Sequence, residues 1–227
     1  MTEKIKSRMV MIDLDGTLIN TAPDLADSVN IMLERMAREP WPLDKVSGWI
    51  GNGVSRLVKR ALTDSMDGEP DSEDYEKGYA LFLEAYGENV SAKSRPYDGV
   101  VAGLDKLKSA GFRLSCVTNK AASFTLPLLA DLKLDGYFEL VVSGDTLPRK
   151  KPDPLPLTYA CEYFGITPQQ GILIGDSAND VKAAIAAGMP VICVNYGYNQ
   201  GVDLTTLDTQ GVIDSLDILD QHITLLD

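Results

Sequence analysis

Residues 9–17 read MVMIDLDGT, and this stretch decides the fold. Residues 9–14 form a short, mostly apolar run that leads into Asp15 and Gly16, which predicts a buried strand followed by a turn. Residues two apart in an extended segment point to the same side, so the carboxylates of Asp13 and Asp15 can face one ligand. Such close carboxylates repel each other unless a proton or a cation such as Mg²⁺ intervenes. The alternative is ordinary turn chemistry, because Asp-Gly is common in turns.

From residue 99 onward, short strand-like runs alternate with helical patterns. We expect strands at 112–117, 140–143, 171–174, 191–195 and, more weakly, 212–213, and helices at 99–110, 121–132, 154–164, 178–187 and from Ser215 to the end. Strands that alternate with helices of ten or more residues favour parallel pairing. The sequence therefore predicts an α/β fold with a Rossmann-like parallel sheet and helices on both faces.

Residues 17–94 follow a different pattern, with helices expected at 23–38, 54–62 and 72–86 and no convincing strand. We therefore expect an all-helical cap inserted at 17–94, between the two parts of an α/β core formed by 1–16 and 95–227. Pro96 and Gly99 are typical of a boundary between two such parts.

The charge balance excludes several classes of function. The 227 residues contain 21 Lys and Arg against 33 Asp and Glu, a net charge of −12. Proteins that bind nucleic acids or anionic membranes depend on basic side chains, so neither partner is expected. A small anionic ligand remains compatible, because a site can be locally positive in an acidic protein.

Other features favour a cytoplasmic enzyme. The longest apolar run, 183–194, is shorter than the about 20 residues that a membrane-spanning helix needs, and no signal-peptide core follows the N-terminus. Cys116, Cys161 and Cys193 fit no zinc or redox spacing and are interpreted as buried thiols in a reducing compartment. The single histidine, His222, is near the end of the chain, so acid–base chemistry is assigned to carboxylates.

Further polar segments follow the other predicted strands. Ligands of open parallel sheets bind beyond the carboxyl ends of the strands. Those ends carry residues 118–120 (TNK), 149–154 (RKKPDP) and 175–180 (GDSAND). Taken singly, these segments also fit a helix cap, a solvated loop and a capped helix start. Together with Asp13 and Asp15 they supply acids, an anion cradle and a lysine, which fits metal-assisted phosphoryl transfer.

These four segments, in this order, resemble the signature of the haloacid dehalogenase superfamily of phosphatases. The matching residues are 13–17 (DLDGT), Thr118-Asn119, Lys151-Pro152 and 175–180 (GDSAND), and the helical insert resembles that superfamily's type-one cap. Within the superfamily, residues 21–25 (TAPDL), 50–53 (IGNG), 60–62 (RAL), 95–100 (RPYDGV) and 197–201 (GYNQG) resemble the bacterial phosphoglycolate phosphatases. The resemblance implies hydrolysis of a small phosphorylated metabolite, most closely 2-phosphoglycolate, with Mg²⁺ as cofactor.

The resemblance also implies roles for the acidic residues. Asp13 would attack phosphorus and form an aspartyl-phosphate, and Asp15 would protonate the leaving group and then deprotonate water. Asp13, the main-chain carbonyl of Asp15 and Asp176 would bind the metal. Asp180 would support Asp176, and it would also orient the lysine at 151.

The remaining site residues would hold the phosphoryl group or its surroundings. Thr118, the backbone of Asn119, and Lys151 would contact phosphoryl oxygens. Thr17 would hydrogen-bond one of the two aspartates of the first segment, Asp15 or Asp13.

Three residues of the insert are candidates for choosing the leaving group. Arg56 and Arg60 are four apart and can share one helix face, which would suit a substrate carboxylate. The simpler interpretation is a solvated basic face paired with the acidic segment 64–76. Asn52, between two glycines, is an equally good candidate.

Two alternatives stay open at this point. The first is another phosphatase, a pyrophosphatase or a phosphomutase of the same superfamily, which would share the chemistry and differ in the cap. The second is a phospho-accepting receiver domain, which also uses Asp, Thr and Lys on a parallel sheet. A receiver is shorter, lacks a helical insert and needs no proton donor like Asp15.

Overall fold

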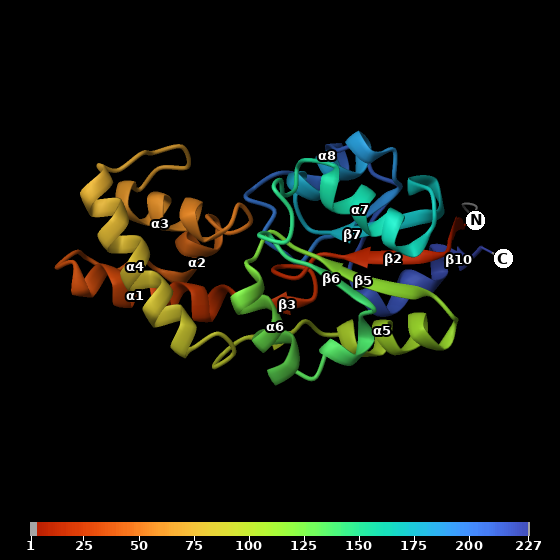
Figure 1. Cartoon of the computed structure of the whole chain (residues 1–227), viewed down its shortest axis with the longest axis horizontal. Helices are drawn as coiled ribbons and strands as arrows, with labels where there is room; N and C mark the ends of the chain where they lie inside the picture. Colours follow the sequence, from red (N-terminus) through yellow and green to blue (C-terminus); the bar gives the residue numbers. More distant parts are fainter. Residues whose placement is uncertain (1–3, 227) are drawn as a thin grey trace.

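A parallel sheet forms the centre of the molecule, for which a computed structural model describes residues 4–226 (Figure 1). Its six strands lie in the order β6-β5-β2-β7-β8-β9, with every neighbouring pair parallel. They are β2 (Met9–Ile12), β5 (Arg113–Val117), β6 (Leu140–Val142), β7 (Gly171–Gly175), β8 (Val191–Val194) and β9 (Gly211–Ile213). The predicted fold class is confirmed, and the strand ends differ from the predicted ones by one or two residues.

The inner strand β2 is buried on both of its faces. Met9 and Met11 belong to one hydrophobic cluster, whereas Val10 and Ile12 belong to the other. Successive side chains of a strand point to opposite faces, so only an uninterrupted apolar run suits a strand that is covered on both sides.

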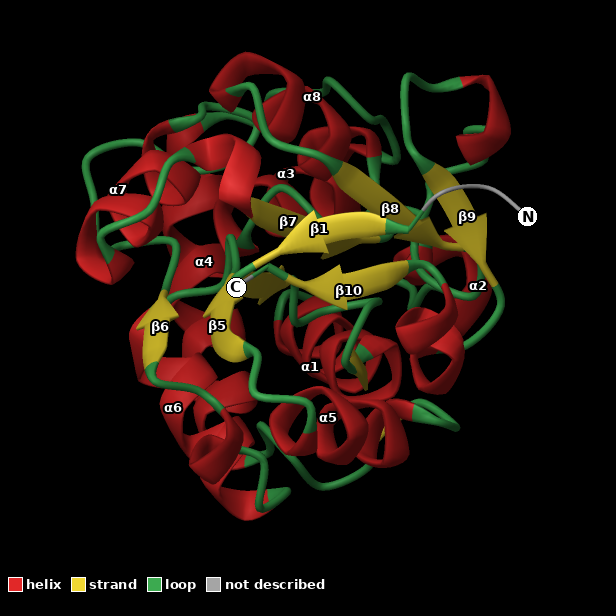
Figure 2. Cartoon of the chain, turned by 90° about the vertical axis from the view of Figure 1, so that its right-hand side faces the viewer, coloured by secondary structure: helices red, strands yellow, loops and turns green. Residues whose placement is uncertain are grey.

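Four helices provide that cover, two on each face (Figure 2). They are α7 (Leu155–Phe164) and α8 (Ala178–Ala187) on one face and α5 (Val100–Ser109) and α6 (Ala122–Asp131) on the other. Leu157 and Val181 pack in the cluster of Met9, and Leu104 and Leu128 pack in the cluster of Val10. The four predicted helices are therefore confirmed.

Four more helices form a separate layer at one end of the molecule (Figure 1, red to yellow). They are α1 (Ala22–Arg35), α2 (Leu43–Ser47), α3 (Val54–Thr63) and α4 (Ser72–Glu88). Met32 of α1 and Phe82 of α4 are fully buried between them. The sequence did not predict α2, because five residues are too few to show a helical period.

The two connections to this helical layer are fastened to each other. β3 (Ile19–Asn20) pairs antiparallel with β4 (Arg95–Pro96). The buried carboxylate of Asp24 accepts hydrogen bonds from the main-chain N–H groups of Lys93 (2.8 Å) and Ser94 (2.7 Å) and from the Ser94 hydroxyl (2.6 Å). The expectation of no strand in this region was wrong at β3, since a two-residue strand leaves no pattern in the sequence.

The C-terminal segment also differs from the prediction. In place of a final helix, a 3₁₀ helix covers Leu216–Gln221 and β10 (Ile223–Leu225) follows, paired in parallel with β1 (Ile5–Ser7). Leu216 and Leu219 are both fully buried. Their three-residue spacing suits the three-residue turn of a 3₁₀ helix, and pairing with β1 satisfies the backbone that follows.

Two predictions about the chemistry of the chain can be compared with the structure. Cys116, Cys161 and Cys193 carry free thiols and are buried, which confirms the prediction that they are buried. Among the helices of residues 4–226, none has both the length and the apolar character that crossing a bilayer requires.

Candidate active site

The predicted site residues follow three neighbouring strands. Asp13 comes directly after β2, Thr118 after β5 and Asp176 after β7. The N–H of Asp13 donates to the carbonyl of Ile174 (2.9 Å), and the N–H of Thr118 donates to the carbonyl of Val142 (2.9 Å). The hydrogen bonds of the sheet therefore continue one residue past β2 and β5, and the polar side chains of the site begin at that residue.

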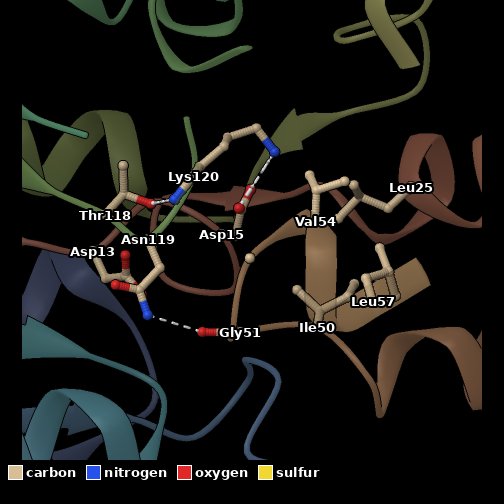
Figure 3. A pocket seen from close by; sticks show the side chains of 11 residues that line it. Asp13, Asp15, Leu25, Ile50, Gly51, Val54, Leu57, Thr118, Asn119 and Lys120 are labelled. Carbon is tan, nitrogen blue, oxygen red and sulfur yellow. Dashed lines mark hydrogen bonds and ion pairs between the residues drawn. The ribbon is translucent and has the colours of Figure 1, made fainter. Parts of the chain in front are cut away.

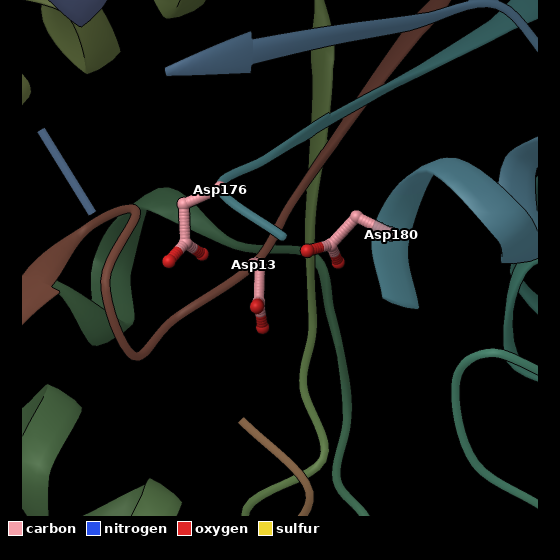
Figure 4. Close-up of side chains that lie close together, drawn as sticks. All are labelled: Asp13, Asp176 and Asp180. Atoms are coloured by element: carbon pink, nitrogen blue, oxygen red, sulfur yellow. The ribbon is translucent and has the colours of Figure 1, made fainter. Parts of the chain in front are cut away.

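Three carboxylates meet at this edge of the sheet (Figure 4). One oxygen each of Asp13, Asp176 and Asp180 lie within 4.8 Å of one another. Burial raises the pKa of Asp13 to about 7, with Lys151 opposing the rise and Asp180 adding to it. Burial and the charges of Asp13 and Asp180 raise the pKa of Asp176 well above its usual range. Asp180, which the sequence suggested as a support for this site, therefore lies beside the two acids that were expected to be side-chain ligands.

One buried ammonium serves this cluster. Lys151 is 3% exposed, and its Nζ lies 2.9 Å from Asp13, 2.7 Å from Asp180 and 2.6 Å from the carbonyl of Val117. Although burial opposes its charge, the two carboxylates raise the pKa of the Lys151 ammonium. The second oxygen of Asp180 accepts hydrogen bonds from the N–H and hydroxyl of Ser177, so Asp180 caps α8 and holds Lys151 at once.

Thr17 contacts a different acid from the one expected. Its hydroxyl donates to Oδ1 of Asp176 (2.9 Å), rather than to Asp13 or Asp15. The reason is the turn at Gly16, whose φ of +88° lets the chain reverse beside Asp176. A Cβ at Gly16 would lie 2.2 Å from an oxygen of Asp176, so this approach requires glycine.

Asp15 has its own set of partners (Figure 3). The hydroxyl of Thr21 donates to its Oδ1 (2.8 Å), and the Nζ of Lys120 lies 3.2 and 3.3 Å from its two oxygens. Although burial opposes its charge, Asp15 raises the pKa of the Lys120 ammonium. The sequence assigns no site role to Lys120 or to Thr21, although both lie in segments that match the family pattern. The sequence feature that could have indicated Lys120 was a lysine next to the predicted anion-binding segment of an acidic chain.

The segment after β5 joins three parts of the site. The Oγ1 of Thr118 accepts a hydrogen bond from the N–H of Lys120 (3.2 Å). The amide of Asn119 donates to the carbonyls of Gly51 (3.1 Å) and Lys151 (2.9 Å). The side chain of Asn119 therefore ties the strand end to the Lys151 loop and to the helical layer.

A cavity of about 30 Å³ lies where the strand ends meet the helical layer (Figure 3). Polar residues of the core line one side: Asp13, Asp15, Thr118, Asn119 and Lys120. The helical layer contributes an apolar wall and two glycines: Leu25, Ile50, Gly51, Gly53, Val54 and Leu57. This volume holds about two water molecules, so little space is left between the helical layer and the acids.

The loop of residues 50–53, here called the latch loop, carries contacts that hold the helical layer against the core. Four core side chains donate hydrogen bonds to its main-chain carbonyls at 2.6–3.3 Å: Asn119 and Asn179 to Gly51, Lys150 to Asn52, and Gln200 to Ile50. Gly53 has a φ of +85°, and a Cβ there would lie 2.8 Å from the Nζ of Lys150. A glycine is therefore needed where the latch loop passes the core.

Arg60 supports the latch loop from inside the helical layer. Its guanidinium donates to the carbonyls of Trp49 (2.6 Å) and Met66 (3.0 Å) and to the side-chain oxygen of Asn52 (2.9 Å). Burial lowers the pKa of Arg60, with the charge of Arg56 adding to the effect. Arg60 and Asn52 therefore bind each other, where the sequence suggested that each could contact substrate.

Arg56 lies on the surface and pairs with the acidic segment. Its guanidinium binds Asp67 (3.1 Å) and Glu69 (2.6 Å), as the simpler interpretation of the sequence predicted. Within the described chain, none of the three candidate specificity residues Asn52, Arg56 and Arg60 lines the cavity.

Comparisons with known proteins agree with this arrangement. A protein of Thiobacillus denitrificans named phosphoglycolate phosphatase is 55% identical over 209 residues, which is 92% of each chain, and one of the same name from Nitrosococcus oceani is 51% identical over 92% of each chain. The crystal structure of a predicted phosphoglycolate phosphatase from Haemophilus somnus superposes with a TM-score of 0.89 and 34% identity, and covers 95% of this chain and 97% of that one. The family model of the haloacid dehalogenase-like hydrolases matches residues 10–194, a range that includes the acid cluster, Lys151 and the helical layer. On both sequence and fold, the chain belongs to the haloacid dehalogenase-like hydrolases.

Proposed function

We propose that this protein is a Mg²⁺-dependent phosphatase that hydrolyses 2-phosphoglycolate to glycolate and phosphate. Two relatives that are 55% and 51% identical over 92% of the chain carry the name of that activity. The observation that supports the chemistry is the cluster of Asp13, Asp176 and Asp180 facing one lysine at the carboxyl edge of the sheet.

The donor set of this cluster fits a hard divalent cation. Three carboxylates against the ammonium of Lys151 leave excess negative charge in a buried place, and carboxylate oxygens are what Mg²⁺ prefers. Asp13, Asp176 and the main-chain carbonyl of Asp15 are the proposed ligands, as the family resemblance implies, whereas Asp180 binds Lys151 and caps α8. A bound Mg²⁺ would neutralise the charge of the phosphoryl oxygens.

The chain's own residues then carry the reaction. A carboxylate oxygen of Asp13 attacks phosphorus, and the bond between phosphorus and the ester oxygen breaks as Asp15 gives its proton to the leaving alkoxide. Asp15 next takes a proton from water, which attacks the aspartyl-phosphate, releases phosphate and restores Asp13. Thr118, the Asn119 backbone and Lys151 hold the phosphoryl oxygens during both steps.

Residues 17–94 would act as the cap of this site, on a core made of 1–16 and 95–227. The small cavity between the strand ends and the helical layer supports this, because movement of the helical layer away from the strand ends would make room for a phosphate ester. Closure of the cap would then exclude all water molecules except the one that attacks the aspartyl-phosphate. The binding partner of this site would be a small phosphorylated metabolite.

A substrate panel with metal titration tests the proposal. We expect 2-phosphoglycolate to have a higher kcat/KM than glycerol phosphate, sugar phosphates, pyrophosphate and p-nitrophenyl phosphate. We expect no turnover of any of them before Mg²⁺ is added. A tenfold preference for another compound would reassign the substrate. A single turnover on p-nitrophenyl phosphate would instead favour a phospho-accepting domain.

A further inference from the structure

One positive charge faces the cavity from the side of the proposed proton donor. Within the described chain, Lys120 is the only basic residue that lines the cavity. Its side chain is 2% exposed, and its Nζ lies 3.2 and 3.3 Å from the two oxygens of Asp15. The ring of Tyr86 lies 4.7 Å from the ammonium and takes the place of solvent on another side.

The apolar side chains on the opposite wall of the cavity strengthen the electrostatic interactions of the Lys120 ammonium. Leu25, Val54 and Leu57 line the cavity from the helical layer, and Figure 3 shows them across from Asp15. Charges interact more strongly where apolar side chains exclude water. A ligand group that enters this part of the cavity therefore meets apolar side chains and a single cation.

The position of Lys120 relative to Asp15 suggests which ligand group that is. Asp15 is the proposed donor to the ester oxygen, so whatever is attached to that oxygen must lie beside Asp15. In 2-phosphoglycolate a single methylene separates the ester oxygen from the carboxylate. An ammonium has three N–H donors, so Lys120 can bind Asp15 and still donate to a second carboxylate.

We propose that Lys120 selects the substrate by binding a carboxylate one carbon away from the scissile ester oxygen. This inference rests on the proposed function and assigns its carboxylate subsite. It replaces Arg56 and Arg60, which the sequence suggested for that task and which bind acidic and carbonyl groups of the helical layer instead. Lys120 is thus a specificity residue on the core, next to the acid that acts on the same substrate.

Inhibitor binding tests this assignment separately from the proton transfer of Asp15. 3-Phosphonopropionate keeps the shape and charge of 2-phosphoglycolate with a carbon in place of the ester oxygen, and propylphosphonate lacks the carboxylate. For the wild-type protein with Mg²⁺, we expect 3-phosphonopropionate to bind at least tenfold more tightly. In Lys120→Met the ratio of the two inhibition constants should fall by about 10- to 100-fold, as expected for a lost charge-assisted hydrogen bond.

Further variants control for damage to the site. Lys120→Gln still donates a hydrogen bond to Asp15 but carries no charge, and it should lose the preference as Lys120→Met does. Lys120→Arg keeps the charge and should keep most of the preference. Lys77→Met removes an exposed lysine of α4 and should leave both inhibition constants as in the wild type.

The outcomes separate the two proposals. A wild-type ratio in Lys120→Met or in Lys120→Gln would overturn the role of Lys120, even if 2-phosphoglycolate is the best substrate. A wild-type protein that neither prefers 3-phosphonopropionate nor hydrolyses 2-phosphoglycolate preferentially would overturn the proposed function itself.

Discussion

At the scale of single residues, the site contains two separate groups of opposite charges. Lys151 binds Asp13 and Asp180, whereas Lys120 binds Asp15. The two aspartates of the first motif are only two residues apart, yet they have different cations beside them. In the proposed mechanism, this separation would let Asp13 act as the nucleophile while Asp15 transfers protons.

Replacement of Asp13 by Asn should abolish turnover without unfolding the protein. The amide keeps the shape of the side chain and removes one of three crowded negative charges, but it cannot attack phosphorus. We expect kcat to fall by at least about 10⁴-fold and the free energy of unfolding to change by less than about 1 kcal/mol. Steady-state kinetics and urea denaturation measure the two effects. Retention of more than a hundredth of the wild-type kcat would contradict the nucleophilic role.

Replacement of Asp15 by Asn should affect substrates according to their leaving groups. Loss of a general acid costs about 10²- to 10⁴-fold, but p-nitrophenolate leaves without needing a proton. Phosphorylation of the protein, the first step, should therefore slow more with 2-phosphoglycolate than with p-nitrophenyl phosphate. Rapid-quench measurement of the phosphorylated protein can follow both rates. Equal slowing of phosphorylation by both esters would exclude Asp15 as the proton donor.

At the scale of elements, hydrogen bonds hold the helical layer to the core in two places, at its two connections and across the cavity. Asp24 joins α1 to the segment before β4, and the latch loop before α3 accepts four hydrogen bonds from the core. The first contact is buried and lies at the two connections. In the proposed mechanism, the second contact would break when substrate enters.

Asp24 should contribute strongly to stability. In Asp24→Asn an N–H group faces the N–H donors that the carboxylate now accepts, so we expect a loss of about 2–4 kcal/mol in the free energy of unfolding. Asp27 on the same helix is the matched control, because its pair with Lys93 is exposed (side chains 47% and 59%) and Asp27→Asn should cost less than about 1 kcal/mol. Similar losses in urea denaturation of both variants would show that Asp24 is no more than a surface contact.

Weakening the latch loop contacts should favour the open arrangement. The double variant Lys150→Ala/Gln200→Ala removes two hydrogen bonds, which together are worth about 1–3 kcal/mol. We expect kcat/KM for 2-phosphoglycolate to fall by about 5- to 150-fold and the free energy of unfolding to fall by no more than about 3 kcal/mol. Limited proteolysis of the latch loop should become faster. An unchanged kcat/KM in that double variant would mean that these contacts do not hold the cap closed over substrate.

At the scale of the whole molecule, the site lies where a parallel sheet and a helical layer meet, and a cation would bind only the folded chain. Asp13 and Asp176 are more than 160 residues apart in the sequence and come together at one edge of the sheet. Because the binding residues converge only after folding, ligand binding and stability are linked.

Metal removal should therefore lower both activity and stability. We expect a chelator to abolish turnover and Mg²⁺ to restore it. Saturation at 100 times the dissociation constant should raise the free energy of unfolding by about 2.7 kcal/mol. Thermal denaturation with and without MgCl₂ measures the gain, and Asp176→Asn should lose it. The same gain in Asp176→Asn would place the cation elsewhere.

Local patterns were enough to predict the sheet and the acids. The run at 9–14 is apolar at every position up to Asp13 because β2 is covered on both faces, and the acids must follow strand ends to reach a ligand. The strands β1, β3, β4 and β10 were not predictable, since each has only two or three residues, includes a polar residue or proline, and is stabilised by a partner distant in the chain.

The sequence by itself determined the parallel α/β fold, the helical insert and the acids Asp13, Asp15 and Asp176, because burial and strand-end chemistry leave a local pattern. Only the tertiary structure decided that Thr17 binds Asp176, that Thr21 and Lys120 bind Asp15, and that Arg60 faces inward. These contacts depend on the direction of a turn and on the packing of the helical layer against the strand ends. No spacing of residues along one helix or strand encodes either of them.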